Sequence, residues 1–136
     1  MIAGRCLCGA VSYRAAAGPI TTRVCWCRLC QAIGAGSATV NACFRTEDVS
    51  IEGTLADHES LADSGARMHR RFCPRCGVHM FSQAEPRPHL IYVRVGTMDD
   101  REAVRPEVTI WTMQAPSWAC IAEDIPSLEA QAPPAG

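Results

Sequence analysis

Nine cysteines are the residues of this chain whose type and spacing most clearly point to chemistry. Seven of them are closely spaced, in the three groups Cys6-x-Cys8, Cys25-x-Cys27-x-x-Cys30 and Cys73-x-x-Cys76. A Cys-x-x-Cys turn lets two sulfurs converge on one metal ion at about 2.3 Å while backbone amides hydrogen-bond the thiolates. The spacing therefore indicates metal binding, with zinc as the expected ion.

Two of these groups are pairs, and the pairs require different backbones. The turn at Cys73 and Cys76 is followed by Gly77, which permits a tight chain reversal. Cys6 and Cys8 are expected in extended backbone, where side chains at i and i+2 share one face. Two pairs together make a four-thiolate site, the closed arrangement of structural zinc.

The third group offers only three thiolates, from Cys25, Cys27 and Cys30. Three protein ligands leave one position on zinc for an external ligand, which distinguishes a reactive site from a structural one. Zinc with three thiolates carries a net negative charge, so a soft fourth ligand such as a thiol suits it better than water. A thiol or a thiol adduct is the expected substrate class.

Other arrangements of the cysteines stay open at this point. Disulfides are disfavoured by the odd cysteine count and the absence of a signal peptide, and iron–sulfur clusters by the absence of a four-cysteine run. All seven cysteines could be structural ligands, since most multi-cysteine zinc sites are closed. Cys27 and Cys30 could also join Cys73 and Cys76 in a zinc ribbon.

Few other residues invite a functional interpretation. Arg28 lies within the middle cysteine group and could pair with a substrate carboxylate. Four arginines cluster near Cys73 and leave a small anionic ligand possible: Arg67, Arg70, Arg71 and Arg75. Cys43, Cys120, Trp111 and Trp118 are expected to be buried.

The elements that position these residues are expected to be short strands. Stretches with strand character cover residues 10–13, 20–24, 37–44, 49–51, 68–72, 78–81, 90–95 and 108–113, with Gly and Pro between them. One helical turn is predicted over 28–33. Residues 2–126 are predicted to form one domain, and residues 127–136, rich in Ala and Pro, a flexible tail.

Length and charge exclude several classes of protein. The chain has 136 residues, a net charge of −1 and no lysine, which favours neither a nucleic-acid nor a membrane partner. The sequence begins without a basic and apolar leader, and no apolar run approaches the roughly 18 residues that span a bilayer. We expect a soluble, cytoplasmic protein and make no prediction of its oligomeric state.

The three cysteine groups, in their order, resemble those of the glutathione-dependent formaldehyde-activating enzyme family, which includes centromere protein V. The resemblance is carried by Gly4-Arg-Cys6-Leu-Cys8-Gly9, Cys25-Trp-Cys27-Arg-Leu-Cys30, Phe72-Cys73-Pro-Arg-Cys76-Gly77, Val95-Gly-Thr-Met-Asp99 and the segment from Arg105-Pro-Glu107 to Trp118. It covers about residues 2–120. One departure is Trp26, which stands where family members commonly have histidine.

The resemblance implies an all-β domain of stacked antiparallel sheets with zinc knuckles and two zinc ions, the second of which can be absent. Cys6, Cys8, Cys73 and Cys76 match the family's structural zinc ligands. The ligands of the family's catalytic zinc are matched by Cys25, Cys27 and Cys30.

The implied activity is that of a carbon–sulfur lyase, which joins formaldehyde to glutathione to give S-(hydroxymethyl)glutathione. We therefore predict an enzyme with glutathione or its adduct as the partner. The alternatives are a binding module stabilised by zinc and a zinc-thiolate protein of redox or metal handling.

Overall fold

The computed structural model describes all residues, 1–136, and confirms the all-β prediction. The strands are β1 (Ile2–Arg5), β2 (Ser12–Ala15), β3 (Thr21–Cys25), β4 (Thr39–Arg45), β5 (Val49–Glu52), β6 (Ala56–Leu61), β7 (Arg67–Phe72), β8 (His79–Ala84), β9 (Leu90–Arg94) and β10 (Val108–Ile110). The helix α1 spans Arg28–Ile33, and three 3-10 helices are η1 (Thr46–Asp48), η2 (Val95–Thr97) and η3 (Thr112–Gln114). No helix is long and apolar enough to cross a membrane.

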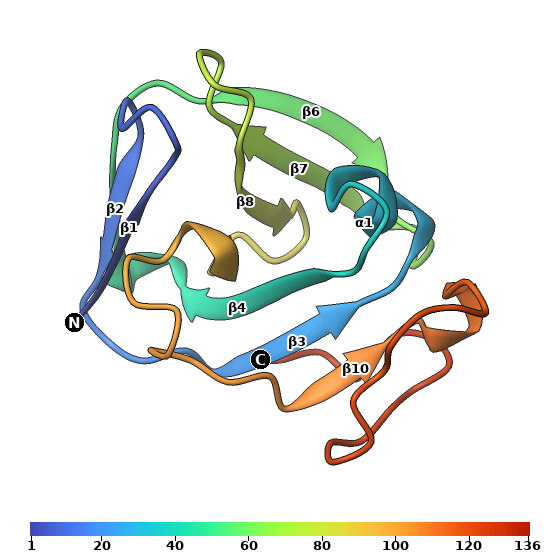
Figure 1. Cartoon of the computed structure of the whole chain (residues 1–136). Helices are drawn as coiled ribbons and strands as arrows, with labels where there is room; N and C mark the ends of the chain where they lie inside the picture. The colour runs from blue at the N-terminus through green and yellow to red at the C-terminus, as the bar shows by residue number, and fades with distance from the viewer.

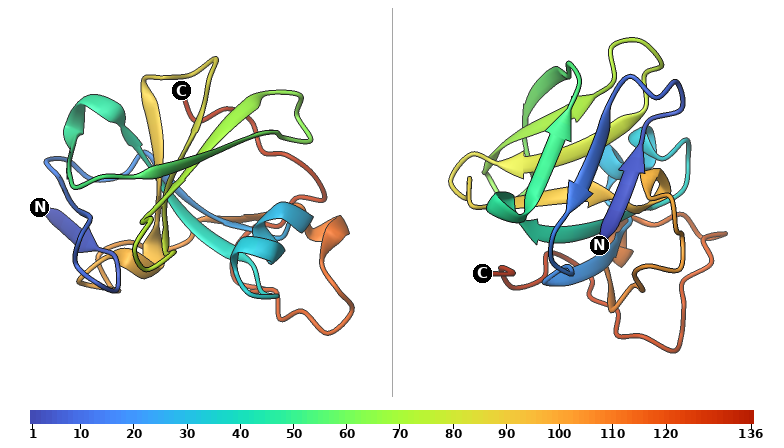
Figure 2. Two further views of the ribbon diagram at one scale, coloured as in Figure 1. Left: turned by 90° about the horizontal axis from the view of Figure 1, so that it is seen from above. Right: turned by 90° about the vertical axis from the view of Figure 1, so that its left-hand side faces the viewer.

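The strands form two sheets of unequal size. The small sheet has the order β1-β2-β5 and the large one β10-β3-β4-β9-β8-β7-β6. All neighbouring strands are antiparallel except β10, which is parallel to β3. The large sheet curls, so that β6 and β7 lie above β3 and β4 in Figure 1, and the small sheet lies in front of it in the right view of Figure 2.

The main core lies between the two sheets and takes alternate residues of the large sheet. Phe44 on β4, Phe81 on β8 and Val93 on β9 are fully buried there, and Phe81 and Val93 are register partners. From the small sheet, Tyr13 meets the Phe81 ring edge-on at 5.4 Å, and its hydroxyl shares a 2.9 Å hydrogen bond with Thr97 Oγ1. The intervening residues of the large sheet therefore face its other side, which carries the site described below.

Two strands lie outside the stretches that the sequence predicts. β6 reads Ala-Asp-His-Glu-Ser-Leu, and its three central residues from Asp57 to Glu59 are polar and exposed, so it lacks the apolar alternation of a half-buried strand. β1 ends at Arg5, and the chain then turns, with the Gly9 N–H donating to the Cys6 carbonyl at 3.2 Å. Cys6 and Cys8 therefore lie in a turn, and the prediction that extended backbone carries them is wrong.

The last ten residues make several contacts with the rest of the chain. Ser127 bridges Thr109 in parallel, and the Leu128 N–H donates to the Thr109 carbonyl at 2.8 Å. Ala132 is buried. Flexibility of residues 127–136 stays a prediction, but this segment forms part of the surface around the large sheet.

Gly53 is a position where the fold requires glycine, which gives a test of the packing between β5 and the turn at residue 10. Its φ is +107°, and an added Cβ would lie 2.2 Å from the Ala10 carbonyl oxygen. Gly53→Ala should lower the free energy of unfolding by about 3 kcal/mol through backbone strain and this clash. Gly18→Ala, whose Cβ would enter open space, is the control for denaturant unfolding and should change little. Equal stability of the two variants would contradict the register of this region.

His69 connects β6, β7 and the end of β8 through hydrogen bonds to two carboxylates. Its Nδ1 lies 2.7 Å from Asp57 and its Nε2 3.3 Å from Glu85. The bond to Asp57 holds the pKa of His69 above its ordinary value, although burial opposes this, and Glu85 adds to the rise.

Because the folded-state pKa is raised, the stabilisation by His69 is complete below the unfolded value of about 6.5 and is lost as pH rises through the folded pKa. The melting temperature of His69→Gln should therefore lie furthest below that of the parent near pH 6, and the gap should narrow toward pH 9. A gap that widens with pH would refute this assignment.

Candidate functional site

Four cysteines from two turns form one cluster at the edge of the main core. Cys6 and Cys8 come from the turn after β1, and Cys73 and Cys76 from the turn between β7 and β8. Their sulfurs all lie within 4.8 Å of one another, and Cys8 Sγ is 3.7 Å from both Cys6 Sγ and Cys73 Sγ. A tetrahedron with zinc–sulfur bonds of about 2.3 Å has edges of about 3.8 Å, which these two sulfur–sulfur distances match.

Backbone amides prepare these sulfurs for a metal. The Val11 N–H donates to Cys6 Sγ at 3.3 Å, and the Cys76 N–H to Cys73 Sγ at 3.5 Å. Hydrogen bonds from the Val78 and Cys8 backbone are the main causes that lower the pKa of Cys76 to about 6, although burial opposes the shift. Amide donors favour the charged form of a thiol, which is the form that binds metal. The cluster can hold a metal ion.

A second cluster forms where β3 leads into α1. Cys25 is the last residue of β3, Cys27 is the N-cap of α1, and Cys30 lies in its first turn, with the three sulfurs within 4.8 Å of one another. The Cys30 N–H donates to Cys27 Sγ at 3.3 Å. Hydrogen bonds from Cys25 and Cys27 lower the pKa of Cys30. Hydrogen bonds with Cys27 and Cys30 raise the pKa of Cys25. Negative charge on this cluster is therefore held mainly by Cys30. A bound cation would let all three cysteines deprotonate, because it would offset the repulsion between their thiolates.

Gln31 and Gln114 fix the helix that carries this cluster. Gln31 Nε2 donates to the Trp26 carbonyl at 2.8 Å and to the Gln114 carbonyl at 2.9 Å, and the Arg28 N–H donates to Gln114 Oε1 at 2.8 Å. Trp26 itself is buried. The six-residue α1 is too short to be stable by itself, so these bonds to η3 hold the cysteines in place.

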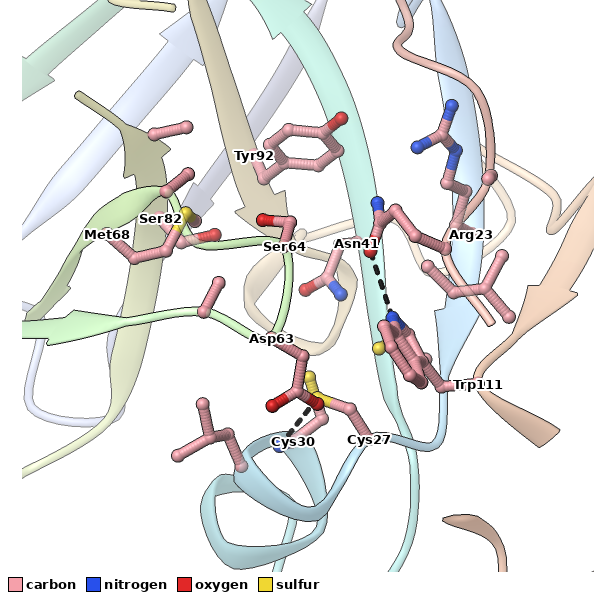
Figure 3. Close-up of a pocket in the computed structure, with 18 of the residues that line it drawn as sticks. Arg23, Cys27, Cys30, Asn41, Asp63, Ser64, Met68, Ser82, Tyr92 and Trp111 are labelled. Atoms are coloured by element: carbon pink, nitrogen blue, oxygen red, sulfur yellow. Dashed lines mark hydrogen bonds between the residues drawn. The ribbon is translucent and has the colours of Figure 1, made fainter. Parts of the chain in front are cut away.

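A cavity of about 340 Å³ adjoins the second cluster and not the first. Its walls come from the face of the large sheet opposite the main core, from α1, from the loop at residues 62–66 and from the C-terminal segment. Figure 3 shows Cys27 and Cys30 at one end of the cavity, Tyr92 and Arg23 toward the other, and Trp111 beside them. The Trp111 Nε1–H donates to Gln131 Oε1 at 2.9 Å, which connects the residue between β10 and η3 to the C-terminal segment. The volume suits a small-molecule ligand.

Four arginines line this cavity, and three of them, Arg23, Arg70 and Arg94, are buried. The sequence did not predict Arg23, Arg87 or Arg94 as site residues. The sequence pointed only to Arg70, as one of the four arginines near Cys73 that leave a small anionic ligand possible. The curling of the sheet is what buries the three.

Arg28 differs from these three. It is exposed and is absent from the cavity wall. Its role as a substrate ligand stays a prediction.

The remaining predicted residues lie outside the cavity or at its margin. Cys43 is fully buried, as predicted. Cys120 is exposed and Trp118 is 69% exposed, so the predictions that they are buried are wrong. Both follow β10 in a stretch without regular structure, where composition does not specify burial.

Comparison with known proteins gives the family and a structure of similar fold. The family model described as glutathione-dependent formaldehyde-activating enzyme matches residues 1–114. A crystal structure of a Rhodobacter sphaeroides protein is similar in fold, with a TM-score of 0.57 and 22% identity over 92% of this chain and 98% of that one. Comparison with curated proteins finds no match. Because the family model covers most of the chain, the protein belongs to the glutathione-dependent formaldehyde-activating enzyme family.

Proposed function

We propose that this protein is a zinc-dependent carbon–sulfur lyase that acts on a thiol adduct, with S-(hydroxymethyl)glutathione formation from glutathione and formaldehyde as the first reaction to test. The family supports glutathione as the thiol partner and formaldehyde as the second reactant. The observation that carries the proposal is the position of Cys25, Cys27 and Cys30 in the wall of the cavity.

The two cysteine clusters would serve different purposes. Cys6, Cys8, Cys73 and Cys76 would hold a structural zinc with four protein ligands, away from the cavity. Cys25, Cys27 and Cys30 would hold a second zinc, which supplies one open position for a soft donor such as a thiol. The number of protein sulfurs in each cluster and their access to the cavity support this division.

The reaction itself requires little covalent chemistry from the protein. The glutathione sulfur forms a bond to the formaldehyde carbon, the carbonyl double bond becomes a single bond, and the thiol proton is transferred to the oxygen. The cavity wall would orient the thiol and exclude water, because it is lined mainly by apolar groups around the buried Cys25 and Cys30. Lyase chemistry is the reverse cleavage of the same carbon–sulfur bond.

The structural role of the first cluster can be tested with a matched pair of cysteine variants. Cys76→Ser removes a ligand that connects two turns, whereas Cys120→Ser alters an exposed, isolated cysteine. Apparent zinc-binding energies of about 10–16 kcal/mol equal or exceed the stability of a domain this size. Cys76→Ser should lose cooperative thermal unfolding and one zinc per chain, and Cys120→Ser should lose neither. A native transition in Cys76→Ser would show that the cluster is not structural.

The proposed function is tested by adding thiols to cobalt-substituted protein. Glutathione should change the visible spectrum through a further sulfur ligand, and Cys27→Ser should abolish the change. Serine is itself a good N-cap, so α1 should persist in this variant, which circular dichroism would check. Cys120→Ser is again the control.

The enzymatic assay then compares S-(hydroxymethyl)glutathione formation with the spontaneous rate. An unchanged rate in fully zinc-loaded protein would eliminate formaldehyde as the reactant. A cobalt spectrum that no thiol alters would eliminate the lyase in favour of a binding module.

A further inference from the structure

Three buried guanidinium groups line the cavity from neighbouring strands. Arg23 on β3, Arg70 on β7 and Arg94 on β9 are only 8%, 7% and 8% exposed. Arg23 and Arg94 are both register partners of Asn41 on β4, so one row across the sheet carries both. Arg70 pairs with Ser82, which pairs with Tyr92, two residues before Arg94 on the same face.

None of the three has a carboxylate partner within 4.0 Å. Three of their hydrogen bonds go to neutral acceptors: Arg23 Nη2 to the Pro133 carbonyl at 2.8 Å, Arg94 Nη1 to Asn41 Oδ1, and Arg70 Nη1 to Ser60 Oγ. Arg94 also lies beside the Cys30 sulfur, which favours its charged form. The Nε atoms of Arg23 and Arg94 are buried without any partner. Burying a guanidinium group without a counter-charge is costly. Arg94 has the sulfur of Cys30 beside it, whereas Arg23 and Arg70 have no negative group as a partner, so their charges favour an anion in this cavity.

The one carboxylate in the cavity wall does not neutralise them. Asp63 is exposed, and its Oδ2 accepts a 3.2 Å hydrogen bond from Gln114 Nε2. One of the arginines lies close to the three-cysteine cluster in the sequence. Arg23 and Cys25 are two residues apart on β3 and so share its cavity face, about 7 Å apart along the strand.

We propose that Arg23, Arg70 and Arg94 form a carboxylate-binding subsite of this cavity, so that the substrate is an anionic thiol whose sulfur lies at Cys25, Cys27 and Cys30 and whose carboxylate lies at the arginines. The thiol part of this inference rests on the proposed function. The guanidinium fork matches a carboxylate with two parallel hydrogen bonds, and the free Nε atoms of Arg23 and Arg94 supply donors for it. Glutathione has two carboxylates, whereas simple neutral or cationic thiols have none. The subsite would therefore select glutathione over such thiols.

Calorimetric titration of zinc-loaded protein tests the subsite with ligands that differ in one group each. Glutathione is compared with its dimethyl ester, which masks both carboxylates, and with S-methylglutathione, which keeps them and lacks the thiol. The ester should bind at least about tenfold more weakly than glutathione, the effect expected from one charge-assisted hydrogen bond pair. Equal affinities for glutathione and its ester would overturn the proposal without any variant.

Variants assign the effect to a residue. Arg23→Gln should weaken the binding of glutathione and S-methylglutathione about tenfold and leave the affinity for the ester unchanged. Arg23→Lys should recover part of the lost affinity, because lysine keeps the positive charge but lacks the guanidinium fork. Arg14→Gln, an exposed residue of the small sheet, is the control. Loss of the same factor for all three ligands in Arg23→Gln would indicate a structural role and overturn the proposal.

The S-methylglutathione titration separates this inference from the proposed function. If S-methylglutathione binds and depends on Arg23 while glutathione leaves the cobalt spectrum unchanged, the subsite is supported and the lyase proposal fails. If glutathione changes the cobalt spectrum but S-methylglutathione binds equally to Arg23→Gln and the parent, the lyase proposal survives and the subsite fails. Inorganic phosphate that competes as strongly as S-methylglutathione would overturn the assignment to carboxylate.

Discussion

The convergence of four cysteine sulfurs from opposite parts of the sequence is the constraint on which the rest of this fold depends. Cys8 and Cys73 are 65 residues apart, yet their sulfurs lie 3.7 Å from one another. One side of the cluster follows the small sheet and the other joins two strands of the large sheet, and both Cys6 and Cys73 belong to the main core. A domain of 136 residues has a modest core. A metal at this point would hold the two sheets together where apolar contacts end.

With the sheets held in this way, the two faces of the large sheet take different roles. On β4 and β9, Ala42 and Val93 point into the main core, whereas their neighbours Asn41 and Arg94 point into the cavity. The alternation of a strand therefore places core residues and cavity-lining residues one position apart. Because the sheet curls and the C-terminal segment covers part of it, the second face is enclosed, and polar residues there meet a ligand-sized space and not bulk solvent.

This arrangement explains which features the sequence could predict. The residues of α1 and the spacing of its cysteines are local, so the helix over 28–33 and the grouping of Cys25, Cys27 and Cys30 follow from a few adjacent residues. β6 was missed because its side chains are mostly exposed and carry no apolar period. Arg23 was missed for a tertiary reason, since nothing in Thr-Thr-Arg-Val-Cys distinguishes a solvated arginine from one that the curled sheet encloses. Trp118 shows the reverse error, a large apolar residue that no element covers.

The central claim is that the three-cysteine cluster holds a zinc ion that remains open to a thiol from the cavity. Anomalous diffraction at the zinc edge, from crystals of the zinc-loaded protein soaked with glutathione, tests it most directly. The account predicts one zinc within Cys6, Cys8, Cys73 and Cys76, and a second zinc bound by Cys25, Cys27 and Cys30 together with the glutathione sulfur. A second zinc with a fourth ligand from the protein, or no zinc at the three-cysteine cluster, would contradict it.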